Sequence, residues 1–218
     1  MAARKRSKKS RKSSAQQAPV ARQGQFASLT GAQWIYGQHA VTAAIINPRR
    51  NCRRLITIKE LATSFQNLTV VVRQHLDNNI TVEIVEKTEI EALFQPGAVH
   101  QGVALLADPL PPMAVEDIFV RAEERQRMLV VALDQITDTQ NIGAILRSAE
   151  AFGAEALLVP DRHTPEISGA ITKAASGAVE SVSIIRSPNL VRALEALKSA
   201  GFWVLGLDVN TPVSLAET

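Results

Sequence analysis

The second half of the chain alternates between two spacings of apolar residues. Met128–Leu133 is a short unbroken apolar run, which is typical of a buried strand, whereas Ile142, Ile145 and Leu146 recur at helical spacing. Continued to position 207, the pattern predicts helix 115–125, strand 128–133, helix 141–152, strand 156–159, helix 166–175, strand 182–185, helix 189–199 and strand 202–207. Strands that alternate with single helices form right-handed crossovers, so we expect a doubly wound α/β domain with a parallel sheet and helices on both faces.

The first half predicts a smaller α/β unit. Its expected elements are helix 34–46, strand 55–58, helix 61–76, strand 81–85, helix 88–94 with Thr88 as a candidate cap, and strand 102–107. The sequence Asp108-Pro-Leu-Pro-Pro112 then interrupts the pattern, because proline favours extended backbone and cannot continue a helix. We therefore expect a basic arm over 1–30, a small domain over 31–107, a linker over 108–114 and the larger domain over 115–218.

Composition limits the class of protein. A chain of 218 residues that is 46% hydrophobic and 21% charged suffices for two such domains. No apolar run approaches the roughly 20 residues that span a bilayer, and the single cysteine, Cys52, cannot form an intrachain disulfide. No Cys/His cluster has metal-ligand spacing, so we expect no metal site and no membrane association. A reducing, cytoplasmic compartment fits this composition.

Charge is distributed unevenly along the chain. Positions 1–59 contain 13 basic residues and no acidic residue, whereas the remainder contains 11 basic and 21 acidic residues. The first 25 residues hold too little apolar surface to offset the entropy of ordering, so we expect a disordered arm. A solvated tail and an organellar transit peptide are the alternatives to an RNA-binding arm. The candidate contacts to RNA phosphates are Arg4, Lys5, Arg6, Lys8, Lys9, Arg11 and Lys12 in the arm, and Arg49, Arg50, Arg53 and Arg54 in a second basic cluster.

The junction after Asp134 carries the candidate chemistry of the larger domain. In open parallel sheets, ligands bind at the carboxyl ends of the strands. This junction lacks the glycine patterns of dinucleotide sites, of phosphate-binding loops and of nucleophile elbows, which argues against those three functions. Gly143 precedes Arg147 by one helical turn, so the missing side chain would leave room for Arg147 or for a ligand, and Asn141 adds an amide at the positive end of the helix. The alternative is a helix start with a solvated arginine.

Several segments match one known family in order. Asn141-Ile-Gly-Ala-Ile-Leu-Arg147-Ser-Ala resembles the first motif of the SpoU/TrmH RNA 2′-O-ribose methyltransferases of the SPOUT superfamily, which has a C-terminal trefoil knot. Ile35-Tyr-Gly-Gln-His-Ala-Val41 with Asn47-Pro, and His100-Gln-Gly-Val103, are similar to the two ends of the family's small ribosomal-protein-like RNA-binding domain. Lys173-Ala-Ala-Ser-Gly-Ala178 resembles a later segment. The chain is most similar to the branch that modifies a guanosine of large-subunit (23S) ribosomal RNA.

This resemblance implies an enzyme that transfers a methyl group from S-adenosylmethionine to a ribose 2′-hydroxyl of ribosomal RNA. The family assigns the catalytic role to the arginine of its first motif, here Arg147. Because a guanidinium is almost always protonated, we expect Arg147 to orient the hydroxyl and to stabilise developing charge, with Asn141 positioning the same groups. Family members act as dimers through the knotted domain, so a homodimer is also implied.

Two pairs of residues in the small domain have both a functional and a structural interpretation. Trp34 and Tyr36 are candidates for stacking on RNA bases, or they belong to the core. His39 and His100 fit the family pattern, but we expect a histidine on a helix and one beside a glycine turn to be structural.

The chain departs from the family after its last predicted strand. The family binds most of its cofactor through a Gly-Glu-Gly-type loop and a Pro-containing strand that leads to Ser-Leu-Asn, and neither occurs before Thr218. We therefore expect a truncated knot domain in which Gly206, Leu207 and Asp208 lie at the rim of the cofactor pocket. Two hypotheses remain. The chain belongs to a methyltransferase that is complete only in a longer protein, or it is a non-catalytic RNA-binding protein or inactive fragment that lacks the cofactor site.

Overall fold

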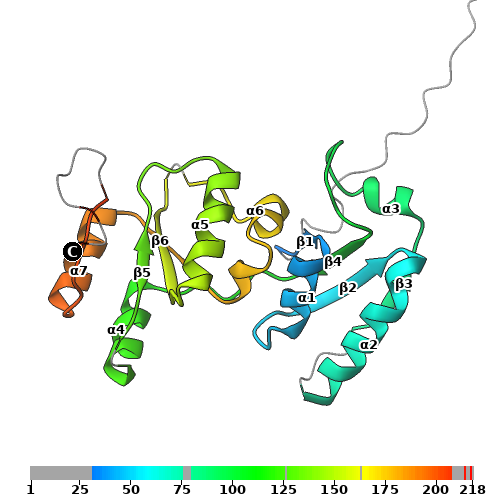
Figure 1. The fold of residues 1–218 in the computed structure, drawn as a ribbon, viewed down its shortest axis with the longest axis horizontal. Helices are drawn as coiled ribbons and strands as arrows, with labels where there is room; N and C mark the ends of the chain where they lie inside the picture. The colour runs from blue at the N-terminus through cyan, green and yellow to red at the C-terminus, as the bar shows by residue number, and fades with distance from the viewer. Residues whose placement is uncertain are drawn as a thin grey trace, which may run out of the picture.

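The structure is a computed structural model that describes residues 31–75, 80–125, 127–162, 164–207, 214 and 217. Its strands form two separate sheets, one in each half of the chain (Figure 1). The predicted linker, residues 108–114, forms neither a helix nor a strand and joins the two halves. The limits of the two domains stay a prediction.

The first half is a four-stranded sheet covered by helices on both faces. Its elements are β1 (Gln33–Tyr36), α1 (Gln38–Ile46), β2 (Cys52–Thr57), α2 (Lys59–His75), β3 (Val82–Ile84), α3 (Lys87–Glu91) and β4 (Val103–Ala107). The strand order is β1-β4-β2-β3, with β4 antiparallel to both neighbours and β3 parallel to β2. β4 is buried along its length because α1 and α2 pack on one face, and α3 packs on the other through Ile90.

The prediction of one helix over 34–46 was wrong at its start. Trp34 lies in β1, where it pairs with Leu106 of β4, and the helix begins only at Gln38. Gly37 separates the two elements with a φ of +93°, a conformation that side chains with a Cβ rarely adopt. Because the sheet pairing of β1 is a long-range contact, the apolar spacing over 34–46 did not reveal it.

The second half has the predicted arrangement of alternating elements. These are α4 (Val115–Glu124), β5 (Val130–Ala132), α5 (Thr139–Ala151), β6 (Ala156–Pro160), α6 (Gly169–Ala174), the 3-10 helix η1 (Ala178–Glu180), β7 (Ser183–Ser187) and α7 (Leu190–Ser199). The three strands are parallel in the order β5-β6-β7. Leu157 faces α5 and α6, whereas Leu158 faces α4 and α7, so helices cover both faces. The α/β fold class with a parallel sheet is confirmed.

The last predicted strand, 202–207, is not a strand in the structure. Phe202 packs against the core formed with α4 and α7, but residues 203–207 have no regular secondary structure. Their side chains are exposed, and Trp203 has 94% of its surface accessible. The prediction of a strand over 202–207 was wrong, because these residues pair with no strand among the described residues.

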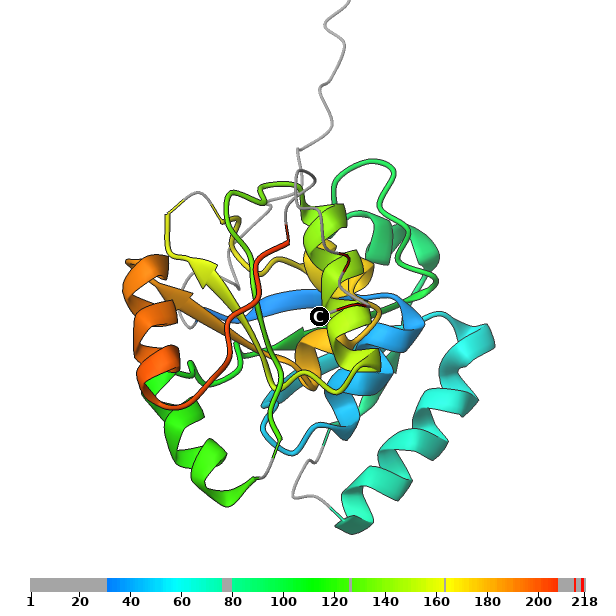
Figure 2. The ribbon, with the colours of Figure 1, turned by 60° about the vertical axis from the view of Figure 1, so that its left-hand side comes forward.

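The two halves pack closely together through α6. In Figure 1, α6 lies between the second sheet and β1 of the first, and the turned view of Figure 2 shows α5 in front of α6. Gly169 of α6 allows this contact, because a Cβ built there would come within 2.4 Å of the Trp34 carbonyl oxygen. Gly177 similarly lies against α1, where an added Cβ would be 2.7 Å from the Ala43 Cβ. Two glycines thus bring the backbones of the halves together.

None of the helices among the described residues combines the length and the apolar character that crossing a membrane requires. No group of three or more His, Cys, Asp or Glu side chains among them is placed to hold a metal ion.

Candidate RNA-modification site

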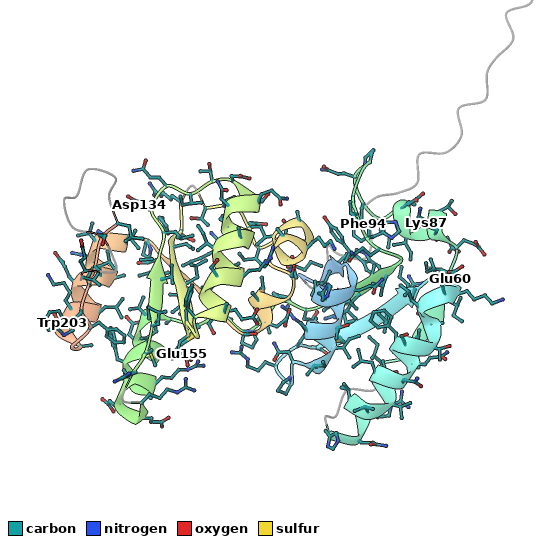
Figure 3. The ribbon with its side chains drawn as sticks, in the orientation of Figure 1. Glu60, Lys87, Phe94, Asp134, Glu155 and Trp203 are labelled. Carbon is teal, nitrogen blue, oxygen red and sulfur yellow. The ribbon has the colours of Figure 1, made fainter. Side chains whose placement is uncertain are left out.

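A pocket lies at the carboxyl ends of β5 and β6, where the sequence predicted a ligand site. It has a volume of about 530 Å³. Its lining residues are Asp134, Gln135, Thr137, Pro160, Arg162 and Thr164. Asp134 and Glu155 mark the two opposite edges of the second sheet in Figure 3. The lining is polar except for Pro160, and it combines one acidic with one basic side chain.

The helix that follows this edge, α5, begins at a capping residue. Asp138 caps α5, because its side chain accepts a hydrogen bond of 3.0 Å from the backbone N–H of Gln140. The chain reaches this cap through Gln135, which has a φ of +56°. Such a backbone conformation is uncommon outside glycine and occurs frequently at functional sites. The sequence pattern did not indicate Gln135 as a site residue, because the identity of a glutamine side chain does not predict an unusual backbone angle.

Asn141 and Arg147 both lie on α5 with exposed side chains. Neither makes a side-chain hydrogen bond or ion pair with any residue that the structure describes. They are six positions apart, which separates them by about 9 Å along the helix axis and places them on different sides of it. Both groups are therefore available to a ligand, but they do not converge on one point. Their catalytic assignment stays a prediction.

The space beside Gly143 is filled by protein, contrary to our expectation that it serves Arg147 or a ligand. A Cβ at Gly143 would lie 2.4 Å from the Ala174 Cβ and 2.8 Å from the Ala174 carbonyl carbon. The glycine of the motif therefore allows α5 and α6 to pack closely. Its role in this structure is to bring the two helices together, and α6 in turn contacts the first half of the chain.

Three of the segments that resemble the SpoU/TrmH family meet at one polar cluster. The Lys173 ammonium donates a hydrogen bond of 2.6 Å to the Gln101 Oε1, which also accepts the Gln38 backbone N–H at 3.1 Å. The Lys173 side chain passes over Gly37, where a Cβ would come within 2.6 Å of it. Burial lowers the pKa of Lys173 from its usual value. Together these segments join α6 to the start of α1.

The second basic cluster is largely engaged by acidic groups within the fold. Arg53 pairs with Asp108 at 2.5 Å, and Arg54 pairs with Glu83 at 2.7 Å. These hydrogen bonds lower the pKa of both carboxyl groups, with Arg53 the largest cause for Asp108 and Arg54 for Glu83. The acidic partners come from distant positions, which is why the cations looked unopposed in the sequence.

Arg50 requires a correction of its expected role. It is only 4% exposed and forms an ion pair of 2.6 Å with Glu180, which is 7% exposed. Its guanidinium also donates to the Asp108 carbonyl at 2.7 Å. A buried guanidinium with these partners is not available to RNA phosphate, so we assign Arg50 to the contact between the two halves. Arg49 is exposed and donates to the Glu180 carbonyl at 3.2 Å, and its contact with RNA stays a prediction.

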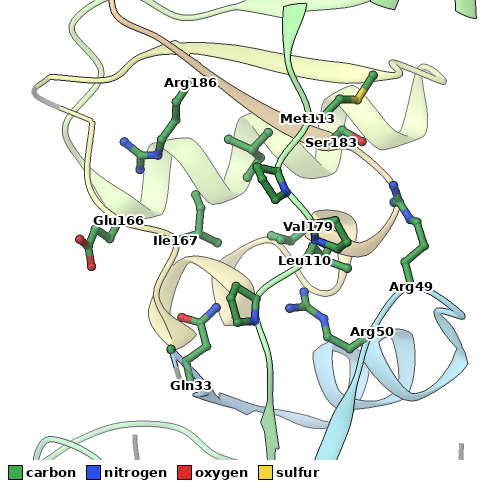
Figure 4. A pocket seen from close by; sticks show the side chains of 15 residues that line it. Gln33, Arg49, Arg50, Leu110, Met113, Glu166, Ile167, Val179, Ser183 and Arg186 are labelled. Atoms are coloured by element: carbon green, nitrogen blue, oxygen red, sulfur yellow. The ribbon is translucent and has the colours of Figure 1, made fainter. Parts of the chain in front are cut away.

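This basic cluster also lies far from the predicted catalytic edge. Glu180 precedes β7, so Arg50 meets the amino edge of the parallel sheet, whereas Asp134 follows β5 at the carboxyl edge. A second cavity, of about 320 Å³, extends along β7 between the halves and is lined by Gln33, Arg49, Arg50, linker residues and Arg186 (Figure 4). Its walls thus come from both halves and from the linker.

The predicted cofactor residues do not enclose a site in the described structure. A Cβ placed on Gly206 would have no neighbouring heavy atom within 4 Å, and Leu207 is 80% exposed. Asp208 lies outside the described residues, as do the arm residues Arg4, Lys5, Arg6, Lys8, Lys9, Arg11 and Lys12. Gly206 and Leu207 therefore give no geometric support for S-adenosylmethionine, and we derive no step of a reaction from them.

Two known families match the two halves of the chain. Residues 34–113 match the family described as RNA 2′-O ribose methyltransferase substrate binding, and residues 128–217 match the SpoU rRNA Methylase family. A protein of Staphylococcus aureus (strain COL) named "Putative TrmH family tRNA/rRNA methyltransferase" is 33% identical over 177 residues, which cover 81% of this chain and 69% of that protein. An uncharacterized tRNA/rRNA methyltransferase of Synechocystis sp. is 35% identical over 184 residues, which cover 84% of this chain and 47% of that protein.

Solved structures support the fold. The SpoU methyltransferase AviRb from Streptomyces viridochromogenes, in complex with the cofactor AdoMet, matches with a TM-score of 0.58 at 20% identity, over 78% of this chain and 62% of that one. An AdoMet-bound rRNA methyltransferase from Sinorhizobium meliloti matches with a TM-score of 0.56 at 21% identity, over 76% of this chain and 58% of that one. The chain thus spans less than two thirds of each of these structures. On the sequence matches in both halves, the chain belongs to the SpoU/TrmH family of RNA methyltransferases.

Proposed function

We propose that this chain is part of an enzyme that methylates a ribose 2′-hydroxyl of RNA, with S-adenosylmethionine as the methyl donor. Membership of the SpoU/TrmH family carries the proposal, and the AdoMet bound to two structural neighbours supports the choice of donor. We further propose that the RNA is ribosomal, that the target is a guanosine of large-subunit ribosomal RNA, and that the protein acts as a cytoplasmic homodimer. The basis of these finer assignments is the resemblance of the sequence motifs.

The side chains of α5 have the chemistry that this reaction needs from the protein. A ribose hydroxyl is a poor nucleophile, so the enzyme must orient it and stabilise the negative charge that develops on its oxygen. Arg147 offers a guanidinium with no partner among the described residues, and Asn141 offers an amide in the first turn of the helix. We assign Arg147 to charge stabilisation and Asn141 to positioning of the RNA. S-adenosylmethionine supplies the methyl group when it is bound.

The assignment of Arg147 is tested by Arg147→Ala in the full-length protein. Because the exposed side chain makes no hydrogen bond or ion pair with the described residues, we expect the variant to keep its unfolding midpoint. Methyl transfer from tritiated S-adenosylmethionine to unmodified ribosomal RNA should fall by about 100-fold or more. Arg192→Ala, which removes an exposed arginine from α7, is the matched control and should retain wild-type turnover. Near-normal turnover by Arg147→Ala would rule out the catalytic assignment.

The second hypothesis is a non-catalytic RNA-binding protein. The exposed, unenclosed positions of Gly206 and Leu207 favour it for the described residues taken alone. Calorimetric titration of S-adenosylmethionine into the full-length protein separates the two hypotheses. Saturable binding supports the enzyme, whereas RNA binding without any uptake of the donor supports the alternative. Mapping ribose methylation across ribosomal RNA in cells with and without the gene then identifies the nucleotide.

A further inference from the structure

Arg186 on β7 organises the segment that follows β6. Its guanidinium donates hydrogen bonds to the Thr164 carbonyl at 3.2 Å and to the Pro165 carbonyl, and it approaches the Asp161 carbonyl at 3.5 Å. These carbonyls lie on both sides of position 163. A guanidinium has five donors in a fixed planar arrangement, which suits it to hold several backbone oxygens at once. Arg186 therefore holds the backbone at Asp161, Thr164 and Pro165.

The segment held in this way contributes to the pocket at the carboxyl edge. Arg162 and Thr164 both line that pocket, together with Asp134 and Gln135 from the β5 side. Arg162 is exposed and has no hydrogen-bond or ion-pair partner in the part of the chain that the structure describes. By contrast, Arg50, Arg53 and Arg54 are each paired with a carboxylate. An unpaired guanidinium in a pocket is a group available for an anion.

We propose that Arg162 contacts a phosphate of the RNA at this pocket and that Arg186 is the positioning residue that holds it there. The proposal rests on the proposed function, because it assumes that the RNA approaches the carboxyl edge of the second sheet, where α5 begins. Asp134 lies on the other wall and repels phosphate, so the phosphate contacts the wall formed by Arg162 and Thr164. Thr164 adds a hydroxyl that donates to the same anion.

The contact is tested by RNA binding, which does not require methyl transfer. The probe is unmodified large-subunit ribosomal RNA, and its dissociation constant from the full-length protein is measured by filter binding across a series of salt concentrations. We expect Arg162→Ala to weaken binding about tenfold, because a charge-assisted hydrogen bond is lost. The slope of log Kd against log salt should fall by about one, since one phosphate contact disappears. Arg192→Ala controls for the loss of one positive charge elsewhere.

The positioning role of Arg186 is tested by a double-mutant cycle. If Arg186 acts through Arg162, Arg186→Ala should weaken RNA binding in the wild-type background but change it less than about twofold in the Arg162→Ala background. Equal effects in both backgrounds would mean that Arg186 acts independently, which overturns its assignment. If Arg186→Ala does not fold, Arg186→Lys replaces it, because an ammonium keeps the charge but cannot contact three carbonyls in one plane. Unchanged unfolding midpoints show which variants are folded.

The outcomes distinguish this inference from the proposed function. If Arg147→Ala abolishes methyl transfer while Arg162→Ala binds RNA with wild-type affinity and salt slope, the inference fails and the proposed function stands. If the wild-type protein binds RNA without methylating it, and Arg162→Ala weakens that binding, the proposed function fails and the inference stands. If Arg162→Ala weakens only the calorimetric binding of S-adenosylmethionine, the anion is the carboxylate of the donor, and the RNA contact is overturned.

Discussion

His100 is a buried histidine whose ring accepts a hydrogen bond from the backbone. Its Nδ1 accepts the backbone N–H of Gly102 at 3.1 Å, so the proton of the neutral ring is on Nε2. The residue is 4% exposed, and burial is the main cause that lowers its pKa from the usual value. This turn leads directly into the central strand β4. His100 therefore has the structural role that its place beside a glycine turn indicated.

A depressed histidine pKa predicts how stability changes with pH. At pH values between the folded and the unfolded pKa of His100, the histidine binds a proton in the unfolded chain but not in the folded chain. The free energy of unfolding therefore falls as pH drops below about 6.5, the usual histidine value. His100→Asn keeps an acceptor without a titrating ring, and we expect it to reduce the loss of stability between pH 7.5 and pH 5. Urea unfolding at both pH values measures the difference. The exposed His39→Asn should show the wild-type loss, and an equal loss in His100→Asn would contradict the argument.

The contact between α5 and α6 depends on a glycine within a helix. By helix propensity alone, Gly143→Ala would stabilise α5 by about 1 kcal/mol. The added Cβ would meet the backbone of α6 at 2.8 Å and 3.0 Å, so one helix has to move. We expect the steric cost to exceed the gain and to lower the free energy of unfolding by about 1 to 3 kcal/mol. Urea denaturation measures this change, and Ser148→Ala on the exposed face of α5 should stay within about 0.5 kcal/mol of wild type. A more stable Gly143→Ala would show that the two helices are not in close contact.

The spacing of apolar residues predicted the elements that pack against their neighbours in the sequence. The alternation of β5, α5, β6, α6, β7 and α7 followed from apolar periodicity, because each element buries one face on its neighbours. β1 was missed, since its pairing partner β4 is distant in the sequence, and residues 203–207 had strand character without a partner in the described chain. The same limit applies to side chains. Arg162 follows the β6 run, but periodicity does not predict that its guanidinium has no partner among the described residues or that Arg186 supports its segment.

The two halves are joined at the amino edge of the second sheet by a buried polar network. The Glu180 carboxylate accepts hydrogen bonds from Arg50 at 2.6 Å and 3.1 Å and from the Asn47 side-chain amide at 2.8 Å. Its carbonyl accepts from Asn47 and Arg49, both at 3.2 Å. These donors all belong to the segment after α1, whereas the acceptor belongs to η1 of the other half. The network therefore links the first half of the chain directly to the second.

Removing the acceptor should uncouple the halves. Glu180→Ala leaves the Arg50 guanidinium buried without its carboxylate, which costs about 3 to 5 kcal/mol in pairs of this kind. Because that cost falls on the contact between the halves, we expect the variant to unfold at lower urea concentration and to separate into two transitions. Fluorescence of the partly buried Trp34 follows the first half, and far-ultraviolet circular dichroism follows both halves. Glu83→Ala breaks the exposed pair with Arg54 and should change stability by less than about 1 kcal/mol. If Glu180→Ala unfolds no earlier than Glu83→Ala, the buried pair does not hold the halves together.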